Sequence, residues 1–188
     1  MRRKLILIRH SLSEIEPDVP AAKWQLSEEG VARARTFAAR VDRGTARCVF
    51  TSTEPKAAHT ARLLGAAWQL PVEETAGLHE HERPEPRMLP RDQFEDRVRA
   101  VFTRPSEVVF GSESADAALE RFGSAVMRAM DQTARDVVIV SHGTVIALFV
   151  AKHTGTDPFE FWKRQQMPFA VTLALPHLRL EKLTFLTR

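Results

Sequence analysis

Two similar segments constrain the fold of this chain more than any other feature. In "LILIRH" (5–10) and "VVIVSH" (137–142), four apolar residues precede one polar residue and a histidine. Uninterrupted apolar runs are typical of strands in a parallel sheet that helices cover on both faces. The carboxyl ends of parallel strands share one edge of the sheet, where ligands bind. If the two strands are neighbours, His10 and His142 face each other across a pocket that also holds Arg9.

The remaining segments alternate between strand and helix patterns. Strands are predicted at 47–52 and 71–75, and residues 169–187 predict an antiparallel pair that turns at Pro176–His177. Helices are predicted over 26–41, 53–68, 92–102 and 113–133, and directly after residue 142. The fold class is therefore α/β, a three-layer sandwich with a mostly parallel central sheet covered by helices on both faces.

Capping residues mark two of the helix starts. Ser27 is predicted to cap its helix, with Glu28 and Glu29 in the positively polarised first turn. Thr53 is predicted as the cap of the next helix, with Pro55 near the first helical position, where a missing N–H matters least. Both helices are expected to begin close to these residues.

Two segments carry no regular pattern. Residues 11–25 form a polar, proline-containing stretch that predicts a loop. Residues 79–92 predict a loop or a partial lid, because they combine Pro84, Pro86 and Pro90 with Arg83, Arg87 and Arg91. These arginines either contact an anionic substrate tail or are ordinary solvated charges.

Length and composition fit one domain spanning residues 1–188. The chain is 44% hydrophobic, which suffices for one sizeable core, and it has no repeat or low-complexity tract. Its 27 basic and 24 acidic residues are interleaved, with a net charge of +3. Nucleic-acid binding is not expected, and the mild excess of arginine suits a small anionic substrate.

Cysteine content and the first residues bear on localisation. A single cysteine, Cys48, rules out an internal disulfide framework. The apolar run in "MRRKLILIRH" ends after Ile8, which is short for a secretory signal, and no stretch approaches a membrane span. We therefore expect a cytoplasmic protein that does not bind membranes.

Six motifs resemble the successive landmarks of one protein family. They are "LIRHS" (7–11), "LSEEG" (26–30), "TSTEPKAAHTA" (51–61), "LHEHE" (78–82), "GSES" (111–114) and "VVIVSHG" (137–143). The ordered set is similar to the histidine phosphatase superfamily, which includes cofactor-dependent phosphoglycerate mutases, fructose-bisphosphatase domains and many small phosphatases. The similarity covers nearly the whole chain.

The resemblance implies roles for four side chains. His10 matches the nucleophile that becomes phosphohistidine, a role that suits a neutral imidazole beside an arginine. Arg9 and His142 match the groups that hold the equatorial phosphoryl oxygens. Glu80 matches the general acid that protonates the leaving alcohol and later activates water. No metal and no cofactor are expected, because protein cations neutralise the phosphate.

Three positions depart from the family's usual pattern. Ser11 replaces a glycine, so it either shifts the local geometry or donates its hydroxyl to the phosphate. Leu12 replaces a glutamate or glutamine, which removes a polar contact at the pocket rim. Lys56 replaces a second phosphate-binding arginine and keeps the charge without the bidentate fork. It is either a phosphate ligand or an ordinary solvated lysine.

Further candidates surround these residues. Gly143 permits a sharp turn and leaves backbone N–H groups at a helix start, a natural anion site. Glu82 is the alternative acid, since an extended segment points it to the same side as Glu80. His79 and His81 share one face, but no third ligand lies at useful spacing, so no metal site is expected.

The residues and the resemblance together predict a phosphomonoesterase, a histidine acid-type phosphatase that acts on small phosphate esters. A length of 188 residues favours it over a phosphoglycerate mutase, which must shelter its phosphoenzyme from water. The alternatives are that mutase, a protein-phosphohistidine phosphatase, and a phosphate-binding or interaction module with weakened catalysis. The expected partner is a small phosphorylated substrate, and the protein is expected to be a monomer or homodimer.

Overall fold

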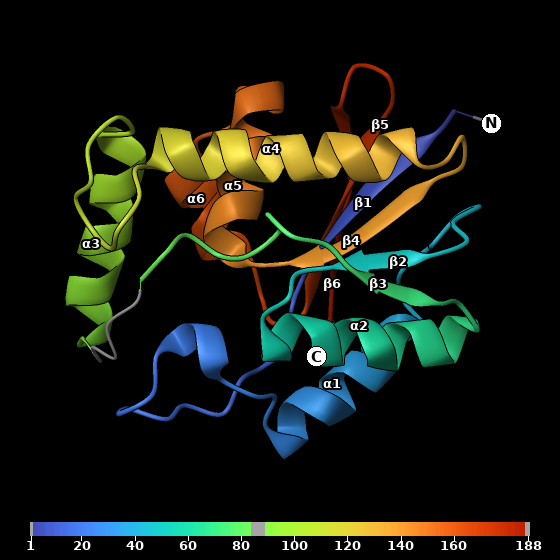
Figure 1. Cartoon of the computed structure of the whole chain (residues 1–188), viewed down its shortest axis with the longest axis horizontal. Coiled ribbons are helices and arrows are strands. Elements are labelled where there is room, and N and C mark those ends of the chain that lie inside the picture. Colours follow the sequence, from blue (N-terminus) through green and yellow to red (C-terminus); the bar gives the residue numbers. More distant parts are fainter. Residues whose placement is uncertain (1, 84–88, 187–188) are drawn as a thin grey trace.

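A mixed sheet forms the centre of the molecule in this computed structural model, which describes residues 2–83 and 89–186. The described residues form six strands in the order β3-β2-β4-β1-β5-β6 (Figure 1). The strands are β1 (Lys4–Arg9), β2 (Val49–Thr51), β3 (Val72–Glu74), β4 (Val137–Ser141), β5 (Phe169–Ala174) and β6 (Arg179–Phe185). The first four in that order pair in parallel, and β5 and β6 add antiparallel pairings. The predicted mostly parallel sheet is confirmed.

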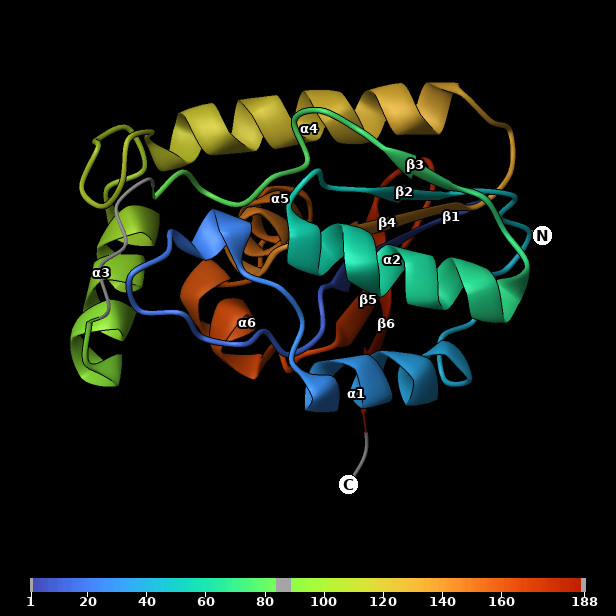
Figure 2. The same cartoon turned by 60° about the horizontal axis from the view of Figure 1, so that its bottom comes forward.

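Helices cover both faces of this sheet (Figure 2). They are α1 (Glu28–Ala38), α2 (Pro55–Trp68), α3 (Arg91–Thr103), α4 (Ala115–Asp131), α5 (Gly143–Thr154) and α6 (Pro158–Arg164). Successive residues of β1 serve opposite faces: Ile6 belongs to the buried cluster of Phe37 from α1, and Leu7 to that of Phe122 and Phe149 from α4 and α5. This alternation explains why the strand is apolar at every position.

The helix starts agree with the sequence at α1 and differ at α2. Ser27 caps α1, and its hydroxyl accepts the N–H of Gly30 at 3.0 Å, as predicted. The N-cap of α2 is Glu54 rather than Thr53, and Pro55 is the first helical residue. The Glu54 side chain makes no capping bond, because its carboxylate is engaged elsewhere.

The segments predicted as loops contain some regular structure. Residues 11–25 include one short 3-10 helix, η1 (Ala21–Lys23), and Arg91 begins α3 rather than lying in a loop. Pro84, Pro86 and Arg87 fall outside the described residues. The sequence did not predict α6, which Asp157 caps. No helix in the described part of the chain is both long and apolar enough to cross a membrane.

The "LSEEG" motif brings α1 close to the segment that follows β1. A Cβ atom added at Gly30 would lie 1.9 Å from the carbonyl oxygen of Leu12. The same carbonyl accepts the N–H of Ser27 at 3.1 Å. A residue without a side chain is therefore required where α1 meets this backbone.

Gly30→Ala is expected to lower the free energy of unfolding by about 2 kcal/mol or more, because the added methyl group displaces backbone. Gly123→Ala is the matched control in α4, since its Cβ would come no closer than 4.0 Å to the Phe149 ring, and alanine favours a helix interior over glycine. Urea unfolding measures both variants. Equal stabilities of the two would contradict the tight contact at Leu12.

Candidate active site

His10 and His142 lie side by side at the carboxyl edge of the sheet. β1 and β4 are parallel neighbours with Arg9 opposite Ser141, and the N–H of His10 donates to the Ser141 carbonyl at 2.9 Å. The centroids of the two imidazole rings are 5.2 Å apart, and both residues are buried. The condition set in the sequence analysis, that these two strands are neighbours, is met.

One hydrogen bond fixes the protonation pattern of the His10 ring. Nδ1 lies 2.7 Å from the carbonyl oxygen of Ser11, and a carbonyl can only accept, so Nδ1 carries the proton. Burial, together with the nearby His142, Lys56 and Arg9, holds the pKa of His10 well below its usual value. The imidazole is therefore neutral, with its lone pair on Nε2.

Arg9 brings a guanidinium beside Gly143. Its Nη1 donates to the carbonyl of Gln165 at 3.0 Å, and its buried Nε has no hydrogen-bond partner among the described residues. Burial lowers the pKa of Arg9 to about 10, which leaves it charged at neutral pH. A Cβ at Gly143 would lie 3.1 Å from the Arg9 Cζ, so this glycine makes room for the guanidinium.

His142 is held through one ring nitrogen. Its Nε2 lies 2.8 Å from the hydroxyl oxygen of Ser52 and 3.6 Å from Oε1 of Glu54. Burial and then the charge of Lys56 hold its pKa well below the usual value. Its buried Nδ1 has no partner among the described residues. Buried polar atoms without a partner call for an explanation, and both this nitrogen and Nε of Arg9 are open to a polar ligand.

Glu80 occupies the amino end of α5. Its carboxylate accepts the N–H groups of Thr144 at 3.1 Å, Val145 at 3.2 Å and His81 at 2.9 Å. Burial raises the pKa of Glu80, but Arg83, His142 and these backbone donors outweigh burial and hold it well below the usual range. The sequence predicted free backbone N–H groups at this helix start. This is wrong for Thr144 and Val145, because their N–H groups donate to the Glu80 carboxylate.

Lys56 is buried in an ion pair that the sequence did not predict. It is 5% exposed, and its Nζ donates to Oε2 of Glu54 and to the carbonyl of Ala21, each at 2.5 Å. The other carboxylate oxygen of Glu54 accepts the N–H of Glu80 at 2.8 Å. The reading of Lys56 as a solvated lysine is wrong. The sequence feature that could have predicted the pairing of Glu54 with Lys56 is their spacing of two residues at the start of α2.

Ser11 does not offer its hydroxyl to this site. Its Oγ donates to the carbonyl of Gly30 at 2.7 Å, and its backbone N–H donates to Oγ1 of Thr60 at 3.0 Å. A hydroxyl has one proton to donate, so of the two alternatives for Ser11, donation of its hydroxyl to a phosphate is wrong. The serine instead ties the segment after β1 to α1.

Glu82 and the neighbouring histidines have other partners. Glu82 accepts the hydroxyl of Ser112 at 3.0 Å and lies 3.4 Å from His79, whereas Glu80 points to the start of α5. Nε2 of His81 lies 2.9 Å from the carbonyl of Glu113. In residues 2–83 and 89–186, no group of three His, Cys, Asp or Glu side chains could hold a metal ion.

Arg83 adds a third cation near the two carboxylates. Its Nη2 donates to the hydroxyl of Thr144 at 2.8 Å and lies 3.9 Å from Glu80. The guanidinium also lies 5.3 and 5.1 Å from the ring centroids of Phe94 and Phe110. Arg91, by contrast, is exposed and pairs with its neighbour one turn along α3.

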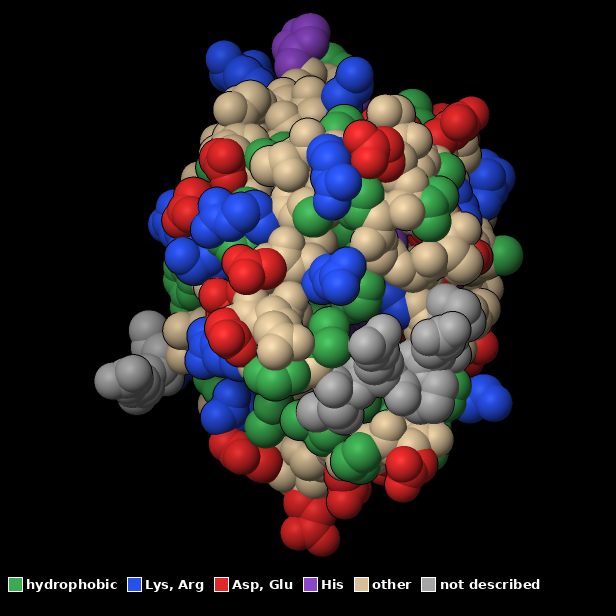
Figure 3. Space-filling view, turned by 90° about the vertical axis from the view of Figure 1, so that its left-hand side faces the viewer, with side chains coloured by type: hydrophobic (Ala, Val, Ile, Leu, Met, Phe, Trp, Pro, Cys, Tyr) green, Lys and Arg blue, Asp and Glu red, His purple; other side chains and the backbone are tan. Residues whose placement is uncertain are grey.

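A cavity of about 230 Å³ lies among part of these charged groups. Glu54, Glu80, Glu82, Lys56 and Arg83 line it, together with alanines of η1, whereas Arg9, His10 and His142 do not. On the face of the molecule beside α3, basic and acidic side chains are interspersed in the middle and upper parts of the view, and acidic side chains gather at its lower end (Figure 3). Lys56 and Arg83 are the cations inside the cavity that can attract an anion.

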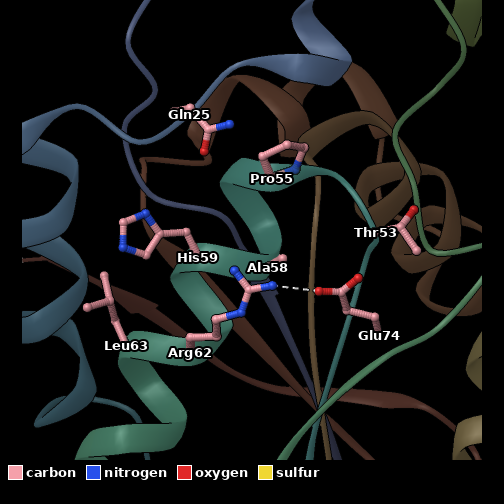
Figure 4. Close-up of a pocket in the computed structure, with 8 residues that line it drawn as sticks. All are labelled: Gln25, Thr53, Pro55, Ala58, His59, Arg62, Leu63 and Glu74. Carbon is pink, nitrogen blue, oxygen red and sulfur yellow. Dashed lines mark hydrogen bonds and ion pairs between the residues drawn. The ribbon is translucent and has the colours of Figure 1, made fainter.

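A second, larger hollow of about 660 Å³ lies along α2. Its walls include Gln25, Thr53 and His59 (Figure 4). The charged side chains that line it, Arg62 and Glu74, pair with each other at 2.7 Å. Lys56, Glu80 and Arg83 line the smaller cavity and not this hollow, so the smaller cavity is the candidate site of the predicted chemistry.

Comparison with known proteins identifies the family. The model of the histidine phosphatase superfamily (branch 1) matches residues 5–182, and the chain belongs to this superfamily. A search of curated proteins found no match.

Solved structures with the same fold are phosphatases. The α-ribazole phosphatase from Shigella flexneri has 25% identity and a TM-score of 0.67, covering 92% of this chain and 91% of that one. Mycobacterial glucosyl-3-phosphoglycerate phosphatase has 18% identity and a TM-score of 0.73, covering 96% and 97%. Phosphoserine phosphatase from Entamoeba histolytica also has 18% identity and a TM-score of 0.73, covering 97% of each chain. The superfamily and these neighbours indicate a phosphatase.

Proposed function

We propose that this protein is a phosphomonoesterase that hydrolyses small phosphate esters through a phosphohistidine on His10, without a metal. The observation that carries the proposal is the hydrogen bond between Nδ1 of His10 and the Ser11 carbonyl. It leaves the Nε2 lone pair on a neutral ring, in a buried site that also contains Arg9 and Lys56. A nucleophile beside fixed positive charge is what phosphoryl transfer requires.

In the first step, Nε2 of His10 attacks phosphorus and the bond from phosphorus to the ester oxygen breaks. Arg9 stabilises the equatorial oxygens through its Nε, which has no partner among the described residues. Nδ1 of His142, which also lacks such a partner, donates to a second phosphoryl oxygen in the tautomer in which Nε2 accepts the hydroxyl of Ser52. The contacts of Arg9 with Gln165 and of His142 with Ser52 hold both side chains in position before the substrate binds.

Glu80 handles the proton in both steps. It is ionised in the structure, but a phosphoryl group beside it raises its pKa by repulsion between like charges. A singly charged ester brings a proton into the site, and Glu80 passes it to the leaving alcohol. Glu80 then takes a proton from the water that attacks phosphohistidine. That proton passes to the product phosphate, which is released, so that Glu80 is ionised again and His10 regains its lone pair.

Two observations support a phosphatase acting on small esters. The three relatives compared above are named for small phosphate esters, and the cavity of about 230 Å³ suits a small substrate. A second candidate is a phosphate-binding module with little turnover. The Glu54–Lys56 pair favours that candidate, since the ammonium group of Lys56 donates to the carboxylate and competes less strongly for a phosphate.

Turnover of a panel of phosphate monoesters in excess EDTA tests the proposal. We expect the rate to be unaffected by EDTA, and an alkaline quench during turnover to trap a phosphoryl group on the peptide containing His10. A rate that EDTA abolishes and a divalent cation restores would contradict the proposed chemistry. Phosphate binding without turnover or phosphoprotein would establish the binding module instead.

A further inference from the structure

Three carboxylates, Glu54, Glu80 and Glu82, line the cavity. Lys56 and Arg83 line it with two positive charges, and Arg9 adds a third positive charge beside Gly143. The two buried histidines are neutral, because their pKa values are held low. The charges of these groups together are close to balanced, although the site is proposed to take a doubly charged phosphoryl group.

Glu54 does not cap the helix at whose start it stands. The carboxylate of Glu80 accepts backbone N–H groups in the first turn of α5, whereas that of Glu54 makes no capping bond at α2. It binds Lys56, whose Nζ has its second contact at the carbonyl of Ala21. An ammonium group has three donors, so one remains for a ligand. The side chains of the ion pair are 6% and 9% exposed, and water screens such a pair weakly.

We propose that Glu54 determines the charge selectivity of the site: it holds Lys56 and lowers the preference of the pocket for doubly charged over singly charged phosphoryl groups. The identity of the ligand rests on the proposed function. A dianion approaching Lys56 also approaches the carboxylate, which repels it more than it repels a monoanion. The same repulsion weakens the binding of the product phosphate and speeds its release.

Charged and titratable groups reach Glu54 from each element packed against it. Lys56 comes from α2, His142 from the start of α5, and Glu80 and Arg83 from the segment before α3. The 3-10 helix η1 contributes a backbone carbonyl through Lys56. A change in phosphate affinity with pH therefore has to be compared between variants rather than read from the wild type alone.

Glu54→Gln removes the charge and keeps the shape. Its amide oxygen can still accept the N–H of Glu80, but Lys56 is left as a buried ammonium without a counter-charge. Inorganic phosphate then supplies that charge. We expect calorimetric titration at about pH 8, where phosphate is mainly a dianion, to show at least about 10-fold tighter binding than in the wild type. At about pH 5, where the monoanion dominates, the gain is expected to be smaller.

Three further variants complete the test. Lys56→Met is expected to weaken phosphate binding, more at pH 8 than at pH 5, because Glu54 is then unpaired. The double variant Glu54→Gln/Lys56→Met is expected to lose the tighter binding. Glu74→Gln, which removes a carboxylate from the exposed pair with Arg62, is expected to bind phosphate like the wild type. Phosphate is also expected to raise the unfolding temperature of Glu54→Gln more than that of the wild type.

Equal or weaker phosphate binding by Glu54→Gln at pH 8, or an equal gain at both pH values, would overturn the inference. If Glu54→Gln does not fold, a loss in Lys56→Met that does not depend on pH would overturn it as well. The readout is binding and needs no turnover. A wild type that shows the expected binding but forms no phosphohistidine would refute the proposed function and leave the role of Glu54 standing.

Discussion

His10→Gln is expected to lower the rate of phosphate-ester hydrolysis by about 10⁴-fold or more, the scale of loss seen when a covalent nucleophile is removed. The amide of glutamine has no lone pair on nitrogen that can attack phosphorus, although its size and polarity are close to those of imidazole. The neighbouring cations remain in place, so phosphate is still expected to bind. Single-turnover rates at saturating p-nitrophenyl phosphate measure the effect.

His59→Gln is the matched control for this experiment. His59 is half-buried and lines the hollow along α2 (Figure 4), which neither His10 nor His142 lines. Its replacement is expected to change the rate less than two-fold. If His10→Gln retains a tenth or more of the wild-type rate, or if both variants lose activity equally, His10 is not the nucleophile.

The low pKa of His10 determines how the rate of phosphoryl transfer changes with pH. The lone pair is present above the folded-state pKa and is lost only as pH falls through it, so phosphoryl transfer is expected to persist well below pH 6.5.

The free energy of unfolding is expected to fall at a higher pH than the rate does. The unfolded chain binds protons at His10 and His142 from about pH 6.5 downward while the folded chain does not, so stability falls there by up to about 1.4 kcal/mol per pH unit for each histidine. Acid assays therefore need a check of folding.

The sequence predicted those parts of the site that depend on local patterns. Four apolar residues before each histidine identify two strands, and parallel strands bring their carboxyl ends together. This placed His10 and His142 at the same edge of the sheet, and the pairing of β1 with β4 in the structure brings them together. Ser27 was also predictable as a helix cap, because the N–H group that it accepts belongs to Gly30, only three residues away.

The charge arrangement was not predictable, because it depends on contacts between distant segments. The carboxylate of Glu80 reaches N–H groups 64 and 65 residues further along the chain. The hydroxyl of Ser11 donates to a carbonyl 19 residues away. The sequence shows that donors and acceptors exist, but the paths of the intervening loops decide which of them meet. For Lys56, the departure from arginine was visible, while the compensating Glu54 looked like an ordinary residue at a helix start.

Glu80→Gln is expected to show whether the carboxylate at the start of α5 is the general acid. A proton is needed by an alkoxide leaving group but hardly by p-nitrophenolate. We therefore expect kcat/KM to fall about 10²- to 10⁴-fold for an alkyl ester such as glycerol phosphate and less than about 10-fold for p-nitrophenyl phosphate. Because kcat/KM includes steps only up to transfer onto His10, slow hydrolysis of phosphohistidine does not disturb the comparison.

The same variant is expected to produce a burst of p-nitrophenol, because its second step lacks the base that activates water. Glu82→Gln is the control: Glu82 is two residues away, half-exposed and bound to Ser112, and its replacement is expected to leave both substrates within about two-fold of the wild type. Equal losses for both esters in Glu80→Gln would mean that Glu80 acts on the structure of the pocket through Thr144 and Val145 rather than through a proton. A leaving-group-dependent loss in Glu82→Gln instead would identify Glu82 as the acid. Comparing two leaving groups in two variants thus separates the proton-transfer role of Glu80 from its support of α5.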